Sequence, residues 1–169
     1  MLATMPGSTY IAVVGAGVCD AATAAVARDV GRLLAERGAV LVCGGLGGTM
    51  AAACEGAMVA GGTTLGILPG DDRRDANPWV DVAVATGLGE ARNALVVRAA
   101  DALIAVGGEL GTLSEIALAL KTGKPVVGID TWELSRRGRP VTDIVRASTA
   151  AEAVEAALRL ARAAGVGST

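Results

Sequence analysis

Short hydrophobic runs alternate along the chain with longer segments in which apolar residues recur every three or four positions. The short runs predict β-strands, and the longer segments predict amphipathic α-helices. We expect strands at residues 10–14, 39–43, 63–68, 82–85, 102–106 and 125–129. We expect helices at residues 21–37, 49–60, 90–99, 112–121 and 150–164. Residues 71–79 are polar and predict a surface loop, and residues 132–139 predict a polar hairpin or loop.

The regular alternation of strands and helices predicts the fold class. The predicted strands are almost continuously apolar, which is typical of a parallel sheet covered on both faces. A closed eightfold barrel needs about 250 residues, whereas this chain has 169. We therefore expect an open, doubly wound α/β fold of the Rossmann-like type, with a mainly parallel sheet and helices on both faces. A single domain over residues 1–169 accommodates all of these elements.

The composition excludes several classes of protein. Hydrophobic residues make up 52% of the chain and aromatic residues only 2%, so the chain is not disordered and its core is built from small aliphatic side chains. The net charge of −2 gives no broad basic surface, and we expect neither a nucleic-acid nor a membrane partner. The chain has no histidine, which excludes a histidine-dependent catalytic triad and a histidine-ligated zinc ion.

The cysteines and the N-terminus predict the cellular compartment. Cys19, Cys43 and Cys54 show no metal-ligand spacing, so we expect no metal site and reduced thiols. Residues 1–9 lack a basic region followed by an apolar stretch, and no apolar run reaches membrane-spanning length. These features predict a cytoplasmic protein.

Three glycine-rich loops each follow a predicted strand and open a predicted helix. Ligands of open parallel sheets bind at that edge, where glycine lets backbone N–H groups approach a phosphate. The first loop, with Gly15 and Gly17, begins like a dinucleotide fingerprint, but Asp20 stands where the third glycine belongs. The alternatives are a nicotinamide or flavin site, which the broken fingerprint disfavours, and a tight turn with Asp20 as the helix cap.

The second and third loops hold the other candidate residues. The second contains Gly44, Gly45, Gly47, Gly48, Thr49 and Met50, and serves either a ligand pocket or close helix–sheet packing. The third contains Gly107, Gly108, Gly111, Thr112 and Glu115. Thr112 and Glu115 also have the spacing of a capping box, so a purely structural role competes with a functional one. Arg92 and Asn93 begin a predicted helix at the same sheet edge.

These residues together resemble the Lonely Guy (LOG) superfamily of Rossmann-like proteins. That superfamily pairs a Glu-Arg-Lys segment with a Pro-Gly-Gly-x-Gly-Thr-x-x-Glu segment. Here residues 91–93 read Ala-Arg-Asn, and residues 107–115 read Gly-Gly-Glu-Leu-Gly-Thr-Leu-Ser-Glu. The resemblance covers roughly residues 10–129, and the most similar subgroup includes molybdenum-cofactor carrier proteins.

The resemblance implies two alternative functions. Catalytic members hydrolyse the N-glycosidic bond of nucleoside 5′-monophosphates and release the free base and ribose 5-phosphate. Arg92 and Glu115 would then be the catalytic residues, while Gly108, Gly111 and Thr112 would bind the phosphate. The alternative is a non-catalytic carrier of molybdenum cofactor or of another phosphorylated ligand. Neither implies a resident cofactor.

Four departures from the motif bear on this choice. Gly107 replaces a proline, Glu109 a glycine, Asn93 a lysine, and Ser114 the first of two acids. They fit the carrier-like subgroup and favour ligand binding over turnover. The resemblance also implies a homodimer or homotetramer, and the helix at 49–60, apolar almost all round, is a candidate interface together with the Arg92 helix.

Overall fold

The computed structural model describes residues 7–166, and the ends of the expected domain, residues 1–6 and 167–169, lie outside the described residues. Within residues 7–166, seven strands form one parallel sheet in the order β4-β3-β2-β1-β5-β6-β9. The strands are β1 (Tyr10–Val14), β2 (Val40–Cys43), β3 (Thr63–Leu68), β4 (Val82–Ala85), β5 (Ala102–Val106), β6 (Val126–Ile129) and β9 (Ile144–Arg146). The predicted doubly wound α/β fold is confirmed, and the strand order reverses between β1 and β5.

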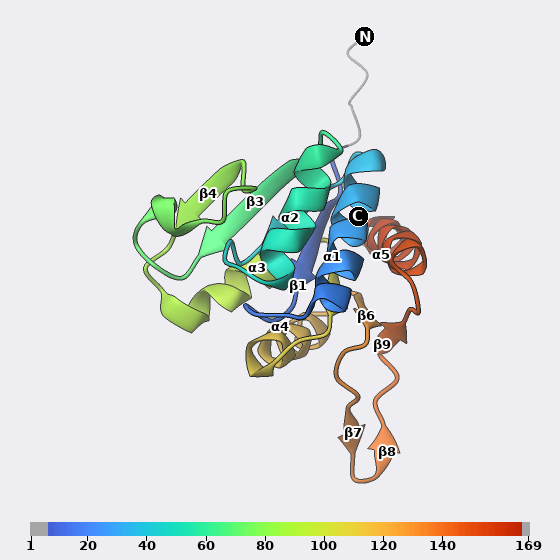
Figure 1. Cartoon of the computed structure of the whole chain (residues 1–169). Helices are drawn as coiled ribbons and strands as arrows, with labels where there is room; N and C mark the ends of the chain where they lie inside the picture. The colour runs from blue at the N-terminus through green and yellow to red at the C-terminus, as the bar shows by residue number, and fades with distance from the viewer. Residues whose placement is uncertain (1–6, 167–169) are drawn as a thin grey trace.

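The helices cover both faces of the sheet (Figure 1). One face holds α1 (Ala21–Glu36), α2 (Thr49–Val59) and α5 (Ala150–Val166), and the other holds α3 (Asn93–Ala99) and α4 (Leu110–Lys121). Because successive strand residues point to opposite faces, Ile11 and Val13 pack toward the first layer while Ala12 and Val14 pack toward the second. Two hydrophobic layers therefore enclose the central strands.

The first glycine loop ends as the capping hypothesis predicts. The Asp20 carboxylate accepts a hydrogen bond of 2.7 Å from the backbone N–H of Thr23 and so caps α1. Gly38 ends this helix with a positive φ of 70°. Asp20 therefore has a local structural role as a helix cap. It also occupies the position at which a dinucleotide fingerprint would have its third glycine.

The polar segment at 132–139 contains a hairpin of β7 (Ser135–Arg136) and β8 (Arg139–Pro140), one of the two predicted alternatives. Other elements differ from the prediction, and the 71–79 loop contains one turn of 3-10 helix, η1 (Arg73–Asp75). The Arg92 helix opens with a second such turn, η2 (Gly89–Arg92). The three-residue strand β9 was not predicted, because it is too short to show a hydrophobic pattern. Helix α4 begins two residues earlier than expected, which changes the roles of Thr112 and Glu115.

None of the helices within residues 7–166 is long and apolar enough to cross a lipid bilayer. The three cysteines are free thiols, and the sulfur atoms of the buried Cys43 and Cys54 lie 3.5 Å apart.

Candidate ligand-binding site

A cavity of about 620 Å³ lies at the carboxyl edge of the sheet, where the strand order reverses. All three glycine-rich loops reach it, so the expectation that they meet at one edge is confirmed. Of the predicted site residues, those that line the cavity are Gly15, Gly17, Met50, Arg92, Asn93, Gly111, Thr112 and Glu115. This volume is within the range of small-molecule sites.

The remaining predicted residues do not line the cavity. These are Gly44, Gly45, Gly47, Gly48, Thr49, Gly107 and Gly108. A Cβ at Gly44 would lie 2.7 Å from the Arg92 guanidinium, and one at Gly108 would lie 2.6 Å from the Thr112 hydroxyl. Both glycines therefore make room for polar side chains of the site. In the second loop, Gly45 and Gly48 also pack closely, against Leu68 and the carbonyl of Ala16, while Leu46 and Met50 line the cavity.

Seven lining residues were not among the predicted site residues: Ala16, Leu46, Pro69, Glu90, Glu109, Leu110 and Ser114. Pro69 follows β3, so its place at the carboxyl end of a parallel strand was the available signal. Glu90 lies in η2, directly before the Arg92 helix. Leu110 is 71% exposed and belongs to the first turn of α4, where no sequence pattern distinguishes it.

Arg92 is buried at the junction of η2 and α3, with 8% of its surface exposed. One guanidinium nitrogen, Nη2, donates to the carbonyl of Gly44 at 3.3 Å, and Nη1 donates to the side-chain oxygen of Asn93. The third nitrogen, Nε, has no hydrogen-bond partner within the part of the chain that the structure describes. Burial lowers the pKa of Arg92, and an unpaired buried donor of this kind is costly unless a ligand accepts from it.

Asn93 and Ser114 occupy two of the positions that depart from the LOG motif, and they contact each other. The Asn93 amide donates to the Ser114 hydroxyl at 3.0 Å, and that hydroxyl donates to the Gly111 carbonyl at 2.6 Å. The motif has a lysine and an acid at these two positions. A neutral hydrogen bond therefore stands where opposite charges would be, and the two departures together leave the net charge of the site unchanged.

Glu115 projects from α4 toward Arg92 and is 6% exposed. Its Oε1 atom lies 3.9 Å from Arg92 Nη1. Burial raises the pKa of Glu115 to about 7, and the positive charge of Arg92 only partly opposes this shift. The carboxyl group can therefore gain or lose a proton near neutral pH.

The start of α4 excludes the capping-box hypothesis for Thr112 and Glu115. The helix begins at Leu110 after Glu109, and no side chain caps its first turn. The preceding glycines allow this early start, because Gly107 and Gly108 adopt positive φ angles of 58° and 116°. Thr112 and Glu115 consequently lie inside the helix and face the cavity. The Thr112 hydroxyl is buried and has no hydrogen-bond partner among the described residues.

Thr49, which packs beneath the first loop, also has a buried hydroxyl without a hydrogen-bond partner among the described residues. Its side chain is fully buried against Gly15, where any Cβ would overlap it. The Thr49 backbone N–H donates to the carbonyl of Ala16 at 3.0 Å and so ties the first two loops together. Unpaired buried hydroxyls thus lie at two of the three loops.

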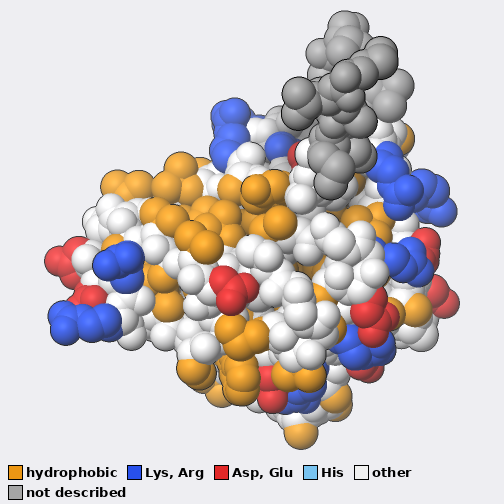
Figure 2. Space-filling view, turned by 90° about the horizontal axis from the view of Figure 1, so that it is seen from above, with side chains coloured by type: hydrophobic (Ala, Val, Ile, Leu, Met, Phe, Trp, Pro, Cys, Tyr) orange, Lys and Arg blue, Asp and Glu red, His pale blue; other side chains and the backbone are white. Residues whose placement is uncertain are grey.

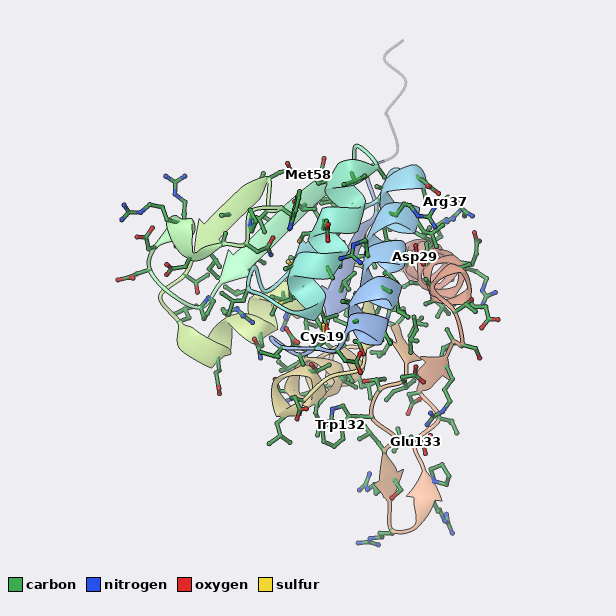
Figure 3. The ribbon with its side chains drawn as sticks, viewed as in Figure 1. Cys19, Asp29, Arg37, Met58, Trp132 and Glu133 are labelled. Atoms are coloured by element: carbon green, nitrogen blue, oxygen red, sulfur yellow. The ribbon has the colours of Figure 1, made fainter. Side chains whose placement is uncertain are left out.

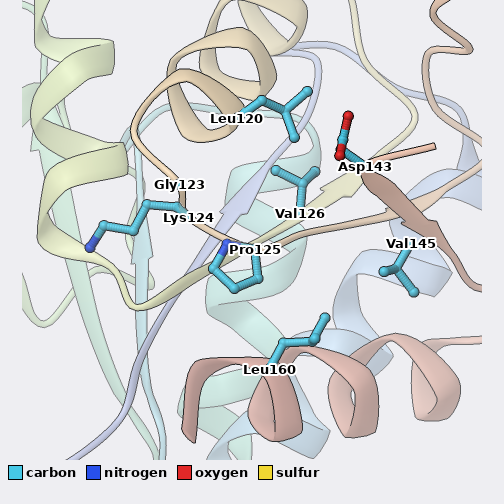
Figure 4. A pocket seen from close by; sticks show the side chains of 8 residues that line it. All are labelled: Leu120, Gly123, Lys124, Pro125, Val126, Asp143, Val145 and Leu160. Atoms are coloured by element: carbon cyan, nitrogen blue, oxygen red, sulfur yellow. The ribbon is translucent and has the colours of Figure 1, made fainter. Parts of the chain in front are cut away.

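A second cavity of about 450 Å³ lies at the opposite, amino-terminal edge of β6 and β9 (Figure 4). Its lining is mainly aliphatic and includes Leu120, Pro125 and Leu160. Lys124 extends away from these side chains and donates to the carbonyl of Ala100. No cluster of three or more cysteine and acidic side chains suited to a metal ion occurs among the described residues.

Residues 8–159 match the model of the SLOG cluster4 family. The chain belongs to the SLOG cluster4 family. An uncharacterized protein of Archaeoglobus fulgidus is 50% identical over 120 residues, which are 70% of this chain and 78% of that protein.

Solved structures of similar fold agree with this SLOG assignment. The molybdenum cofactor binding protein of Rippkaea orientalis is 34% identical, with a TM-score of 0.83 over 92% of this chain and 99% of that chain. The Moco carrier protein of Chlamydomonas reinhardtii is also 34% identical, with a TM-score of 0.80 over 92% and 99% of the two chains. The resemblance of this chain to LOG-like and carrier-like proteins is therefore confirmed.

Proposed function

We propose that this chain is a carrier that binds a phosphorylated ligand of the molybdenum-cofactor type. The observation on which the proposal rests is the buried, unpaired hydroxyl of Thr112 beside the uncapped first turn of α4. The N–H groups of that turn have no intrahelical partners. Two solved relatives of high structural similarity are described as molybdenum-cofactor binding or carrier proteins, which supports the choice of cargo.

In this proposal the phosphate binds at the start of α4. The N–H groups of the first turn and the helix dipole favour an anion there. The Thr112 hydroxyl donates to a phosphate oxygen, and the unpaired Nε of Arg92 supplies a charge-assisted donor. Both groups then recover the hydrogen bonds that they lack without ligand, so binding stabilises the folded chain.

A second candidate function is hydrolysis of a nucleoside 5′-monophosphate. It is favoured by the buried carboxyl of Glu115 near Arg92. When the base leaves, positive charge develops on the ribose, and a carboxylate held against the sugar stabilises that charge. Because the pKa of Glu115 is about 7, activity by this mechanism would rise with pH up to about 7 and then level off.

One incubation separates the two functions. The chain is incubated with AMP, and free adenine is measured by chromatography. The carrier proposal predicts no adenine above the level of a Glu115→Gln control. Adenine release by the wild type that falls roughly a hundredfold or more in Glu115→Gln would instead establish the hydrolase.

We also propose a homo-oligomer in the cytoplasm, and the structure suggests a different interface from α2. That helix packs most of its apolar residues against α1 and the sheet, and Val59 at its last position is exposed. The uncovered apolar surface lies at the other face, where Val82 and Val84 of β4 and Leu95 of α3 are at least 40% exposed. In the view from above, hydrophobic side chains gather on the side of β3 and β4 (Figure 2).

The proposed cytoplasmic location rests on the three free thiols, which fit a reducing compartment.

A further inference from the structure

The β7–β8 hairpin projects from the body of the molecule beyond the end of the sheet (Figure 1). Its tip carries Arg136, Arg137 and Arg139, which are three of the 15 lysine and arginine residues of the chain within four positions. All three side chains are exposed. None of them forms an ion pair with any residue that the structure describes.

The folded chain gains no stability from this charge. Arg136 and Arg139 lie directly opposite each other in the antiparallel register, and like charges in that arrangement are destabilising. Arg137 is also one of two non-glycine residues with positive φ within residues 7–166, at 53°. The flanking Ser135 and Pro140 are exposed, so no core packing offsets these costs. An anionic partner that pairs with the arginines would offset them.

The base of the hairpin contacts the loop that opens α4. The Thr131 hydroxyl donates to the carbonyl of Gly107 at 2.5 Å, and the Trp132 indole donates to the carbonyl of Glu109 at 3.2 Å. Trp132 lies beside α4, while Glu133 lies nearer the hairpin (Figure 3). A partner on the hairpin would therefore sit at the same edge of the molecule as the ligand cavity.

We infer that the β7–β8 hairpin docks an acidic surface of a partner protein. The basic surface is small, and exposed carboxylates of Asp130 and Glu133 stand in the segment that leads from β6 into the hairpin, with Glu133 paired to Arg146 at 2.8 Å. Nucleic-acid interfaces spread phosphate contacts over a wide basic surface, which three arginines at one hairpin tip do not provide. A cluster of three arginines instead matches a few carboxylates, which guanidinium groups bind in a planar, bidentate way.

The inference is tested with a labelled twelve-residue peptide of alternating glutamate and serine. Its binding to the full chain is measured by fluorescence anisotropy at low ionic strength, beside a twelve-nucleotide single-stranded DNA. The test variant is Arg136→Gln/Arg137→Gln/Arg139→Gln. The control, Arg73→Gln/Arg98→Gln/Arg159→Gln, removes the same charge from three exposed arginines elsewhere.

We expect the hairpin variant to bind the peptide at least about tenfold more weakly, and the control to bind within about twofold of the wild type. Added salt weakens the wild-type affinity toward that of the hairpin variant. Equal loss in both triple variants would overturn the proposal, because net charge alone would then explain binding. Tighter binding of the DNA than of the peptide, lost in the hairpin variant, would assign the surface to nucleic acid instead. A fall in the solution mass of the hairpin variant alone would assign it to contacts between copies of this chain.

Discussion

Glu115 is a buried carboxyl group whose proton is held more tightly in the folded chain than in the unfolded one. Burial raises its pKa from 4.5 to about 7. Between these values the folded state keeps a proton that the unfolded state has released, so stability falls as the pH rises from 4.5 to 7 and is level above. The charged form of Glu115 therefore costs stability at neutral and alkaline pH.

The first prediction follows for Glu115→Gln, which keeps the shape but cannot release a proton. Relative to the wild type, the variant should gain about 3 kcal/mol in free energy of unfolding between pH 4.5 and pH 8. Denaturant unfolding of both proteins at the two pH values measures the difference. A difference that does not change with pH would show that Glu115 titrates normally.

The second prediction concerns the hydrogen bond between Asn93 and Ser114. Asn93→Lys should destabilise the chain, because it places an unbalanced charge at a buried position, and Ser114→Asp should destabilise it less, because Ser114 is exposed. The double variant restores opposite charges and should recover part of the loss, with a coupling energy of about 1 kcal/mol or more. Urea unfolding of the four proteins measures the coupling, and additive losses would contradict it.

The sequence predicted which residues gather at the site better than what each one does. The glycine loops indicated the sheet edge at which the cavity lies, and eight of the predicted residues line that cavity. Sequence spacing could not distinguish a capping box from an inward-facing Thr112 and Glu115, because both interpretations need the same residues. Only the positive φ angles of Gly107 and Gly108, which bring the helix start forward to Leu110, decide between them.

At the scale of elements, α1 and α2 pack unusually closely through two glycines. A Cβ on Gly31 would overlap the carbonyl of Ala53, and a Cβ on Gly56 would overlap the carbonyl of Arg28. The two helix backbones therefore touch at both points. Since α2 follows directly from the second glycine loop, this contact also fixes the position of that loop beside the cavity.

The third prediction compares two glycine-to-alanine substitutions in helices. Gly31→Ala should destabilise the chain by about 3 kcal/mol, because a backbone contact must open. Gly165→Ala in α5 has open space around it and should stabilise by up to about 0.5 kcal/mol through helix propensity. Thermal unfolding measures both. Equal effects of the two substitutions would show that the α1–α2 contact is not close.

The elements themselves were predicted to different degrees. The central strands are continuous apolar runs that alternate with amphipathic helices. This pattern left few alternatives to an open, doubly wound α/β fold. The polar residues 132–139 were predicted as a hairpin or loop, and a hairpin lies there. Strand β9 was missed, because it is short and its position depends on tertiary contacts, such as the pairing of Val126 with Ile144, which no local periodicity reveals.

At the scale of the whole molecule, the apolar surface over β4 and α3 has no cover within residues 7–166. In the pairing of β3 with β4, Leu65 lies opposite Val82 and Ile67 lies opposite Val84. These four side chains therefore project from the same face of the sheet. Ile67 is buried beside α3, whereas Val84 is 44% exposed. The covering helices thus stop before the sheet edge.

The fourth prediction is that this surface joins copies of the chain. The wild type should have a solution mass of at least twice 16.6 kDa at micromolar concentration, and Val84→Glu should lower it to 16.6 kDa. Val59→Glu, on the exposed side of α2, is the matched control and should leave the mass unchanged. A wild-type monomer, or dissociation by Val59→Glu alone, would contradict this interface.

The central claim is that the start of α4 holds the phosphate of a bound ligand, and Thr112→Val tests it most directly. Valine keeps the shape of the side chain and removes a buried hydroxyl that has no partner among the described residues. The measurement is the molybdenum retained per chain after anaerobic loading with molybdenum cofactor and gel filtration, with the unfolding temperature of the unloaded protein as its control. We predict near-stoichiometric molybdenum on the wild type. Thr112→Val should retain molybdenum at least about tenfold more weakly, which corresponds roughly to the loss of one charge-assisted hydrogen bond. The unfolding temperature of the variant should be equal to that of the wild type or higher. Undiminished retention by a folded Thr112→Val, or no retention by the wild type, would contradict the account.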